Sequence, residues 1–189
     1  RMIYVNKMDI TGADFFRVVG MMKDRLHANA VPIQLPIGKE MTFRGIVDLM
    51  TMEADVYYDD LGKDMRVEEI PEDMKDLAEE YHEKMIESIC ETDEELMEKY
   101  FGGEEITREE ATLALHEGII AGSITPVYCG SATKMWGVIA MMDAIAESFP
   151  RFTARKVEKY ENGEEVEINV DGDPAIFVYK TVADPFVGQ

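Results

Sequence analysis

The tetrad Asn6-Lys7-Met8-Asp9 follows the apolar run Met2–Val5, which predicts a buried strand with polar side chains at its carboxyl end. Open α/β sheets bind nucleotides at that edge. The Asp9 carboxylate can accept two parallel hydrogen bonds, which matches the N1–H and 2-amino groups of guanine but not adenine. The Lys7 stem can lie on the face of the base, and the Asn6 amide can donate to a ring acceptor. Taken alone, these four residues also suit an ordinary polar turn.

A second motif with complementary chemistry occurs 121 residues later. The apolar stretch Thr125–Cys129 predicts another short strand, and it runs into Gly130-Ser131-Ala132 before a helix expected over 137–149. Small residues allow backbone N–H groups to approach a ligand, and such a donor would pair with the 6-oxo group of guanine but not with the 6-amino group of adenine. The alternative is a plain strand-to-helix turn. Together the two motifs favour a guanine site made of Asn6, Lys7, Asp9, Ser131 and Ala132.

With both motifs in place, the chain closely resembles the elongation factor G family of translational GTPases. The matching stretches are Val5–Asp9 with Thr11–Phe15, Pro32–Gly38, Gly45–Leu49, Cys129–Ala132 and Ala183–Gly188. The last of them sets this family apart from ribosome-protection proteins and peptide-release GTPases. The resemblance implies a cytoplasmic GTPase that uses GTP to move tRNA and messenger RNA on the ribosome, with GTP or GDP as its ligand.

Three elements of that family are absent from the sequence. Its phosphate-binding loop (G-x-x-x-x-G-K-[ST]), switch threonine and D-x-x-G segment lie upstream of the tetrad, and none of them occurs in this chain. The phosphate-binding loop holds the β- and γ-phosphates and Mg²⁺. We therefore expect an internal piece of a larger GTPase that has no catalytic residue of its own and does not hydrolyse GTP alone.

The expected fold class is α/β. The resemblance implies the C-terminal part of a P-loop GTPase parallel sheet at 1–30 and 123–150, with an inserted α+β subdomain, the G′ subdomain, at 31–122. A linker and the first strands of a β-barrel domain II are expected at 151–189, where Asn162-Gly163 predicts a hairpin turn and alternation over 175–182 predicts a strand.

Periodicity supports these divisions. An apolar stripe predicts a helix over 13–26, short strands follow from Val31 to about Val67, and Pro71 begins a helix with apolar residues at three-and-four spacing. The short strands are expected to be antiparallel. Two capping boxes predict two more helices, one formed by Thr92 with Glu95 and the other by Thr107 with Glu110.

Charge supplies a second functional observation. The sequence carries 39 acidic residues against 19 basic ones, and the stretch 68–110 alone holds 18 acidic residues against four basic ones. Such a surface should repel RNA phosphate and attract a basic protein. The resemblance implies the basic C-terminal domain of the ribosomal stalk protein as that partner, with Glu87, Glu91 and Glu94 as the contacts. These three align only if their helix continues past Thr92, and the alternative is a merely solvated acidic face.

The remaining reactive side chains are assigned to structure. Cys90 falls on a predicted helix and Cys129 on a predicted buried strand, so both are expected to be ordinary reduced thiols. The histidines have no spacing with the cysteines that suggests a metal site; they are His27, His82 and His116. No apolar run approaches membrane-spanning length.

Some positions depart from the family pattern. Thr133-Lys134-Met135-Trp136 replaces the Phe-Lys-Asn-Lys that commonly follows Ser131-Ala132, and Ile10 replaces a frequent Arg. These changes spare the base-binding residues but leave a paralogue, or a ribosome-protection GTPase, as an alternative. Two further hypotheses are a module whose acidic subdomain only binds a protein, and a structural domain with coincidental motifs.

Overall fold

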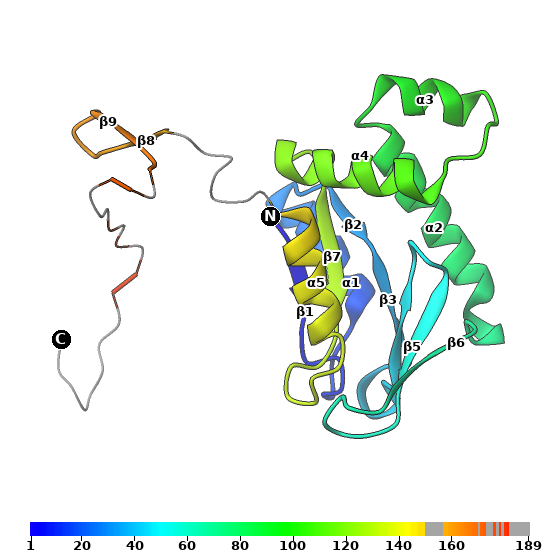
Figure 1. Ribbon diagram of the computed structural model, residues 1–189. Helices are drawn as coiled ribbons and strands as arrows, with labels where there is room; N and C mark the ends of the chain where they lie inside the picture. Colours follow the sequence, from blue (N-terminus) through cyan, green and yellow to red (C-terminus); the bar gives the residue numbers. More distant parts are fainter. Residues whose placement is uncertain (150–156, 170, 173–175, 177, 179, 182–189) are drawn as a thin grey trace, which may run out of the picture. The chain divides into compact units, whose positions relative to one another are not determined.

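The computed structural model describes residues 1–149, 157–169, 171–172, 176, 178 and 180–181. The chain divides into two units, residues 1–149 and 150–189, which are described separately. Figure 1 shows the ribbon coloured along the sequence.

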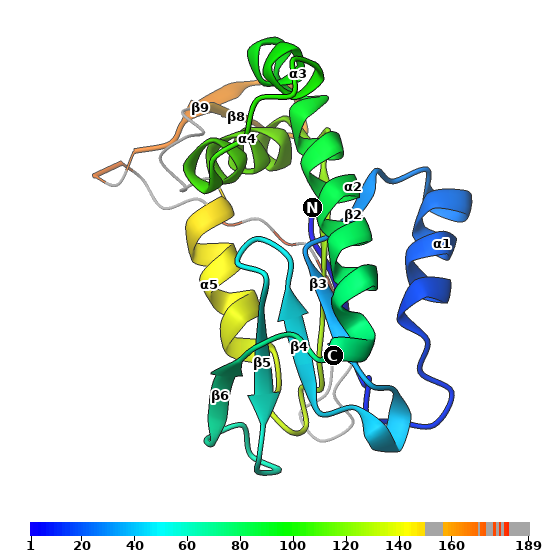
Figure 2. The ribbon, with the colours of Figure 1, turned by 90° about the vertical axis from the view of Figure 1, so that its right-hand side faces the viewer.

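The first unit contains a parallel sheet with strand order β1-β7-β2. Its strands are β1 (Ile3–Val5), β7 (Thr125–Cys129) and β2 (Ala30–Pro32). The helices α1 (Phe15–Leu26) and α5 (Val138–Ser148) lie on opposite faces of this sheet (Figure 2). The antiparallel pairing expected from Val31 onward is wrong for β2, because Ala30–Pro32 pairs in parallel with Thr125–Val127. The central strand β7 is buried along its whole length, as expected for a parallel sheet covered on both faces.

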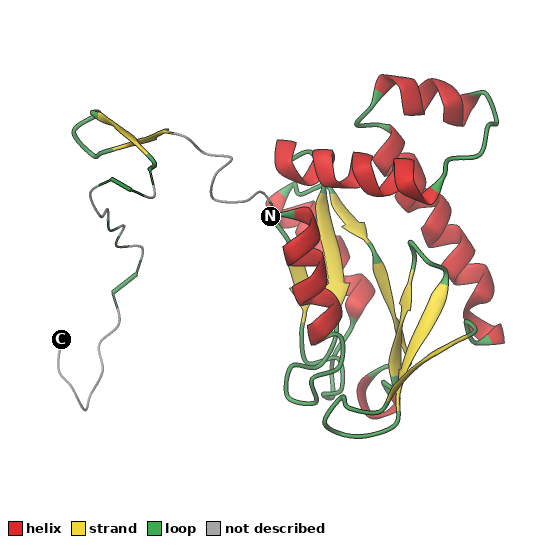
Figure 3. Cartoon of the chain, in the orientation of Figure 1, coloured by secondary structure: helices red, strands yellow, loops and turns green. Residues whose placement is uncertain are grey.

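The intervening segment (residues 33–124) leaves the parallel sheet after β2 and returns to it at β7. It first forms an antiparallel sheet of order β3-β4-β5-β6. Figure 3 draws the strands of the chain in yellow and its helices in red. The elements of this part are β3 (Gln34–Ile37), the 3-10 helix η1 (Glu40–Thr42), β4 (Gly45–Asp48), β5 (Glu53–Tyr57) and β6 (Met65–Glu68). Three helices follow a 3-10 turn, η2 (Glu72–Met74); they are α2 (Lys75–Cys90), α3 (Glu94–Phe101) and α4 (Arg108–Ala121). Leu35, Ile46 and Leu49 are fully buried in the core.

The end of α2 differs from the sequence prediction. The expected capping box of Thr92 with Glu95 is wrong, because Asp93 is the N-cap of α3 and accepts a hydrogen bond from Leu96 N at 3.0 Å. The Thr92 hydroxyl instead donates to Ile89 O at 2.7 Å and closes the end of α2. Two adjacent residues were suited to capping, and the carboxylate took the position one residue further along.

The capping box of Thr107 with Glu110 is confirmed at the start of α4. The Glu110 carboxylate accepts from Thr107 N at 2.8 Å and from Lys99 Nζ at 2.7 Å, which ties α3 to α4. The Lys99 bond and the Thr107 backbone bond lower the pKa of Glu110 from 4.5 to about 2.

We expect an NMR titration of the Glu110 carboxyl carbon to show a midpoint near pH 2. Because the folded pKa is the lower one, this group contributes stability that is present above about pH 4.5 and lost as the pH falls towards 2. Lys99→Met should move the midpoint back towards the ordinary value. A midpoint near 4.5 in the unchanged chain would contradict the α3–α4 tie.

The second unit contains a hairpin of β8 (Val157–Lys159) and β9 (Glu165–Glu167), paired antiparallel. Gly163 takes a φ of +86° in the turn, and its N–H donates to Tyr160 O at 2.9 Å. The predicted Asn-Gly hairpin is confirmed. The linker at 151–156 lies outside the described residues, and so does much of the predicted strand at 175–182, where 175, 177, 179 and 182 are not described.

Candidate nucleotide site

The two predicted motifs meet at one edge of the parallel sheet. Strands β1 and β7 are hydrogen-bonded neighbours, with Val5 opposite Cys129, so the loops that follow them begin side by side. We call residues 6–13 the first loop and residues 130–137 the second loop. Gly130 N donates to Val5 O, and Met8 N donates to Gly130 O, both at 3.1 Å. These backbone bonds continue the ladder beyond the strands and hold the two loops together.

Asn6 joins the loops through its side chain. Its Oδ1 accepts from Lys7 N at 2.8 Å and from Ala132 N at 3.0 Å. Its Nδ2 makes no hydrogen bond with another described residue, so it is available to a ring acceptor. The Ala132 amide expected to bind the base is therefore shared with Asn6. The neighbouring Thr133, which was not predicted as a site residue, is exposed, and its amide is unpaired among the described residues.

Met8 is buried in the hydrophobic core and so anchors the first loop. Its side chain is 1% exposed, whereas Lys7 is exposed and Asp9 is half-buried. Lys7 has a φ of +63°, a left-handed conformation that non-glycine residues seldom adopt and that often occurs at binding sites. Within the described part of the chain, the Asp9 carboxylate has no hydrogen-bond or ionic partner. A carboxylate placed in this way fits the paired donors of guanine.

Ser131 is buried and makes hydrogen bonds to other residues of the second loop. The residue is 1% exposed, and its backbone exchanges two hydrogen bonds of 3.0 Å with Trp136. Its hydroxyl accepts from Lys134 N at 3.4 Å. Of the two residues predicted in this loop, Ala132 is thus exposed at the surface and Ser131 is engaged within the protein.

Gly130 is required where the second loop begins. A Cβ atom on this residue would lie 2.2 Å from Trp136 O and 2.3 Å from the Tyr4 hydroxyl. That hydroxyl donates to Trp136 O at 3.1 Å, and burial raises the pKa of Tyr4. Tyr4 and Trp136 were not predicted as site residues, because neither carries a recognisable base-binding pattern.

The three predicted partner-binding carboxylates do not share one helix. Glu87 lies in α2, Glu91 is the residue that caps its end, and Glu94 is the first residue of α3. The turn at Thr92 and Asp93 separates them, so the alignment expected from a continuous helix is absent. All three still belong to residues 75–101, which we call the acidic α2–α3 stretch.

Both cysteines lie at the ends of secondary-structure elements, and one histidine ring lies close to a backbone carbonyl. Cys90 ends α2 and Cys129 ends β7, and both are buried, unpaired thiols. His82 Nδ1 lies 2.7 Å from Leu49 O. In the part of the chain that the structure describes, no three His, Cys, Asp or Glu side chains are grouped to hold a metal ion. None of the described helices is both long and apolar enough to cross a membrane.

Comparison with known proteins shows which family this chain belongs to. Residues 1–151 match the family model described as the elongation factor Tu GTP binding domain. The chain belongs to that family. A solved structure from Thermus thermophilus is similar over 82% of the chain, at 31% sequence identity and a TM-score of 0.73. The chain spans 23% of the length of that protein.

Membership explains the parallel sheet with helices on both faces, which fits a GTPase domain. It also implies a guanine nucleotide and Mg²⁺ as ligands of the family. The residues of this chain fit the base of such a nucleotide, because donors and an unpaired carboxylate meet at the two loops. They do not include a phosphate-binding loop, so the residues that would hold the phosphates and Mg²⁺ are not among them.

Proposed function

We propose that this chain is the guanine-recognising part of a translational GTPase of the elongation factor G type. The observation that carries the proposal is the Asn6 side chain, which binds the backbone of both loops and so assembles one site from two distant motifs. Asp9 accepts from N1–H and the 2-amino group, and Lys7 covers the base. The Thr133 amide donates to the 6-oxo group, and the Ala132 amide, whose one N–H already donates to Asn6, contributes only a shared bond.

Nucleotide competition in the full-length protein that carries this chain tests the proposal. Fluorescent GDP would be displaced by unlabelled GDP and by ADP, and we expect a preference for GDP of at least about a hundredfold. That figure corresponds to about 2.7 kcal/mol, which two unmatched polar groups can account for. Equal displacement by ADP would refute guanine recognition and leave the protein-interaction hypothesis.

We further propose that the intact protein uses GTP to move tRNA and messenger RNA on the ribosome. The long match to elongation factor G stretches in the sequence supports this over a ribosome-protection role. Mapping the ribosome's position on messenger RNA should show an advance of one codon with GTP and the full-length protein. Release of a bound inhibitor without that advance would favour the ribosome-protection alternative.

The acidic α2–α3 stretch supports a second proposal, that this part of the chain binds the basic C-terminal domain of the ribosomal stalk protein. The described charges there are mostly unpaired carboxylates on exposed positions. Attraction between such a surface and a basic domain weakens with salt, since the Debye length is roughly 8 Å at physiological ionic strength. The same charges disfavour contact with RNA phosphate.

An isotope-edited NMR titration with the stalk domain tests this contact at low and physiological salt. We expect shifts in α2 and α3 that salt weakens and that Glu87→Lys, Glu91→Lys and Glu94→Lys together abolish. A matched control reverses three exposed carboxylates outside the stretch, Asp24, Glu164 and Asp171. No shifts in a folded chain, or equal loss in the control, would refute the stalk contact.

A further inference from the structure

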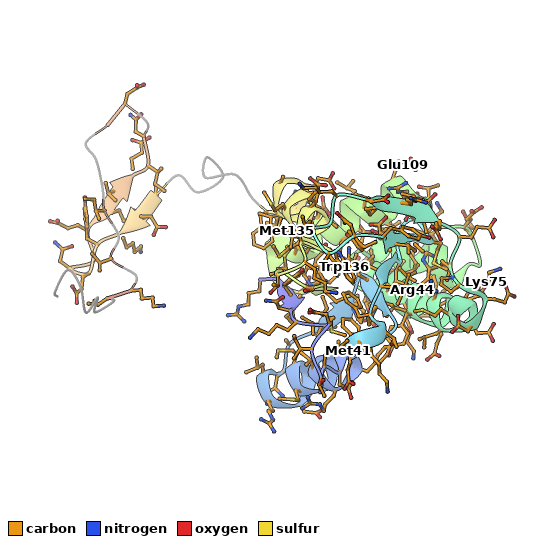
Figure 4. The ribbon with its side chains drawn as sticks, turned by 90° about the horizontal axis from the view of Figure 1, so that it is seen from below. Met41, Arg44, Lys75, Glu109, Met135 and Trp136 are labelled. Atoms are coloured by element: carbon orange, nitrogen blue, oxygen red, sulfur yellow. The ribbon has the colours of Figure 1, made fainter. Side chains whose placement is uncertain are left out.

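Two turns of the intervening segment reach the edge of the parallel sheet where the base-binding loops lie. One is η1 (Glu40–Thr42), and the other is the β5–β6 turn, residues 58–64. Figure 4 looks onto this edge, with Trp136 near its middle and Met135 and Arg44 to either side. Each turn contacts a different loop.

The first contact is made by Glu40. Its carboxylate accepts from Gly12 N at 2.8 Å, and its own N–H donates to Met8 O at 2.9 Å. Both partners belong to the first loop, on either side of Asp9. Glu40 has a φ of +52°, a strained conformation for a residue with a side chain, and the two bonds hold it there.

The second contact is built around Trp136, the single tryptophan in the sequence. The residue is 5% exposed, and its Nε1 donates to Asp59 O in the β5–β6 turn at 2.8 Å. Its ring stacks on Tyr57 at 5.4 Å between centroids and 13° between planes. The Tyr57 hydroxyl accepts from Gly137 N at 2.9 Å.

Further contacts join the β5–β6 turn to the second loop. Lys134 Nζ lies 4.4 Å from the centre of the Trp136 ring and 2.9 Å from Asp60 Oδ1. Gly62 has no side chain where a Cβ would lie 3.0 Å from Met135 O. The β5–β6 turn therefore contacts residues 134–136, and buried Ser131 is bonded to the same part of the loop through Trp136 and Lys134. Ala132 and Thr133 lie between the two fixed ends.

We propose that Glu40 and Trp136 are positioning residues, through which the intervening segment holds the two base-binding loops, each from a separate turn. Glu40 sets the first loop and the Asp9 carboxylate; Trp136, with Tyr57, sets the amides of Ala132 and Thr133. This rests on the proposed guanine site. Loops ordered before binding lose less entropy on binding, so these contacts lengthen the lifetime of the bound nucleotide and sharpen its selection.

Base analogues separate the two contacts in the full-length protein. Inosine diphosphate lacks the 2-amino group that faces Asp9, and 6-thioguanosine diphosphate replaces the 6-oxo oxygen that faces the amides by sulfur but keeps the N1–H and 2-amino groups. Glu40→Ala should lower the preference for GDP over the inosine nucleotide about three- to tenfold and leave the preference for GDP over the 6-thioguanosine nucleotide unchanged. Trp136→Phe and Tyr57→Phe should do the reverse. Each should also release fluorescent GDP about three- to tenfold faster, the effect of one lost hydrogen bond.

Matched variants serve as controls. Tyr58→Phe removes a neighbouring hydroxyl of the same turn that bonds Glu68 instead of the loop, and it should match the wild type. Glu40→Gln keeps an acceptor oxygen for Gly12 and should recover most of the selectivity that Glu40→Ala loses. If the variants lower both preferences equally, in step with the melting temperature, the residues are merely structural and the inference is wrong. Wild-type selectivity in all variants also overturns it, whereas an unselective wild type overturns the proposed function itself.

Discussion

Asp9→Asn in the full-length protein should weaken GDP binding about a hundredfold and strengthen binding of xanthosine diphosphate. The amide keeps one acceptor oxygen but turns an NH₂ donor towards the 2-amino group of guanine, which is also a donor. Hydrogen bonds to a charged partner contribute about 1.5–3 kcal/mol, so losing one and opposing another gives a change of this size. Xanthine carries an oxo group at that position and accepts from the new amide. Competition against fluorescent GDP measures both affinities.

Asp24→Asn is the matched control, because it makes the same chemical change at an exposed position of α1. It should leave both affinities unchanged. If Asp9→Asn kept full guanine selectivity, Asp9 would not be the residue that distinguishes the base, and the assignment of the first loop would fail.

Gly130→Ala should destabilise the chain by about 3 kcal/mol. The added methyl group would meet the Trp136 carbonyl at 2.2 Å and the Tyr4 hydroxyl at 2.3 Å, and the first of these is backbone that cannot swing aside. Overpacking of a tight site typically costs about 1–3 kcal/mol, and a backbone clash belongs at the upper end. Urea unfolding followed by circular dichroism measures the change.

Gly20→Ala tests the same substitution where space is open. No atom lies within 4 Å of the added Cβ, and Gly20 is in the interior of α1. Alanine favours a helix over glycine by about 1 kcal/mol, so this variant should be stabilised. Equal effects at the two positions would show that the close approach at Gly130 is not a constraint.

The parts of the fold set by local sequence were predictable. The apolar stripe located α1, the pair Thr107 and Glu110 located the start of α4, and Asn162-Gly163 located the hairpin. The start of α3 was misplaced by one residue, because Thr92 and Asp93 are both suited to capping and the Thr92 hydroxyl instead bonds Ile89 O at the end of α2.

The motifs predict the chemistry proposed for the site, but they do not predict the contacts that support its loops. Asn6, Lys7 and Asp9 occur together in the chain, so their residue types indicate their ligand. The contact of Trp136 with Asp59 joins residues 77 positions apart, and that of Glu40 with Gly12 joins residues 28 apart. No local periodicity predicts such contacts, because they depend on how the antiparallel sheet is placed against the parallel one.

A crystal structure of the full-length protein bound to GDP would test the account most directly. We predict that the guanine N1 and 2-amino nitrogens lie within about 3.2 Å of the Asp9 carboxylate oxygens. The 6-oxo group should lie equally close to the amide nitrogen of Ala132 or Thr133, with Asn6 still joining the loops. A guanine base bound away from these two loops would contradict the account.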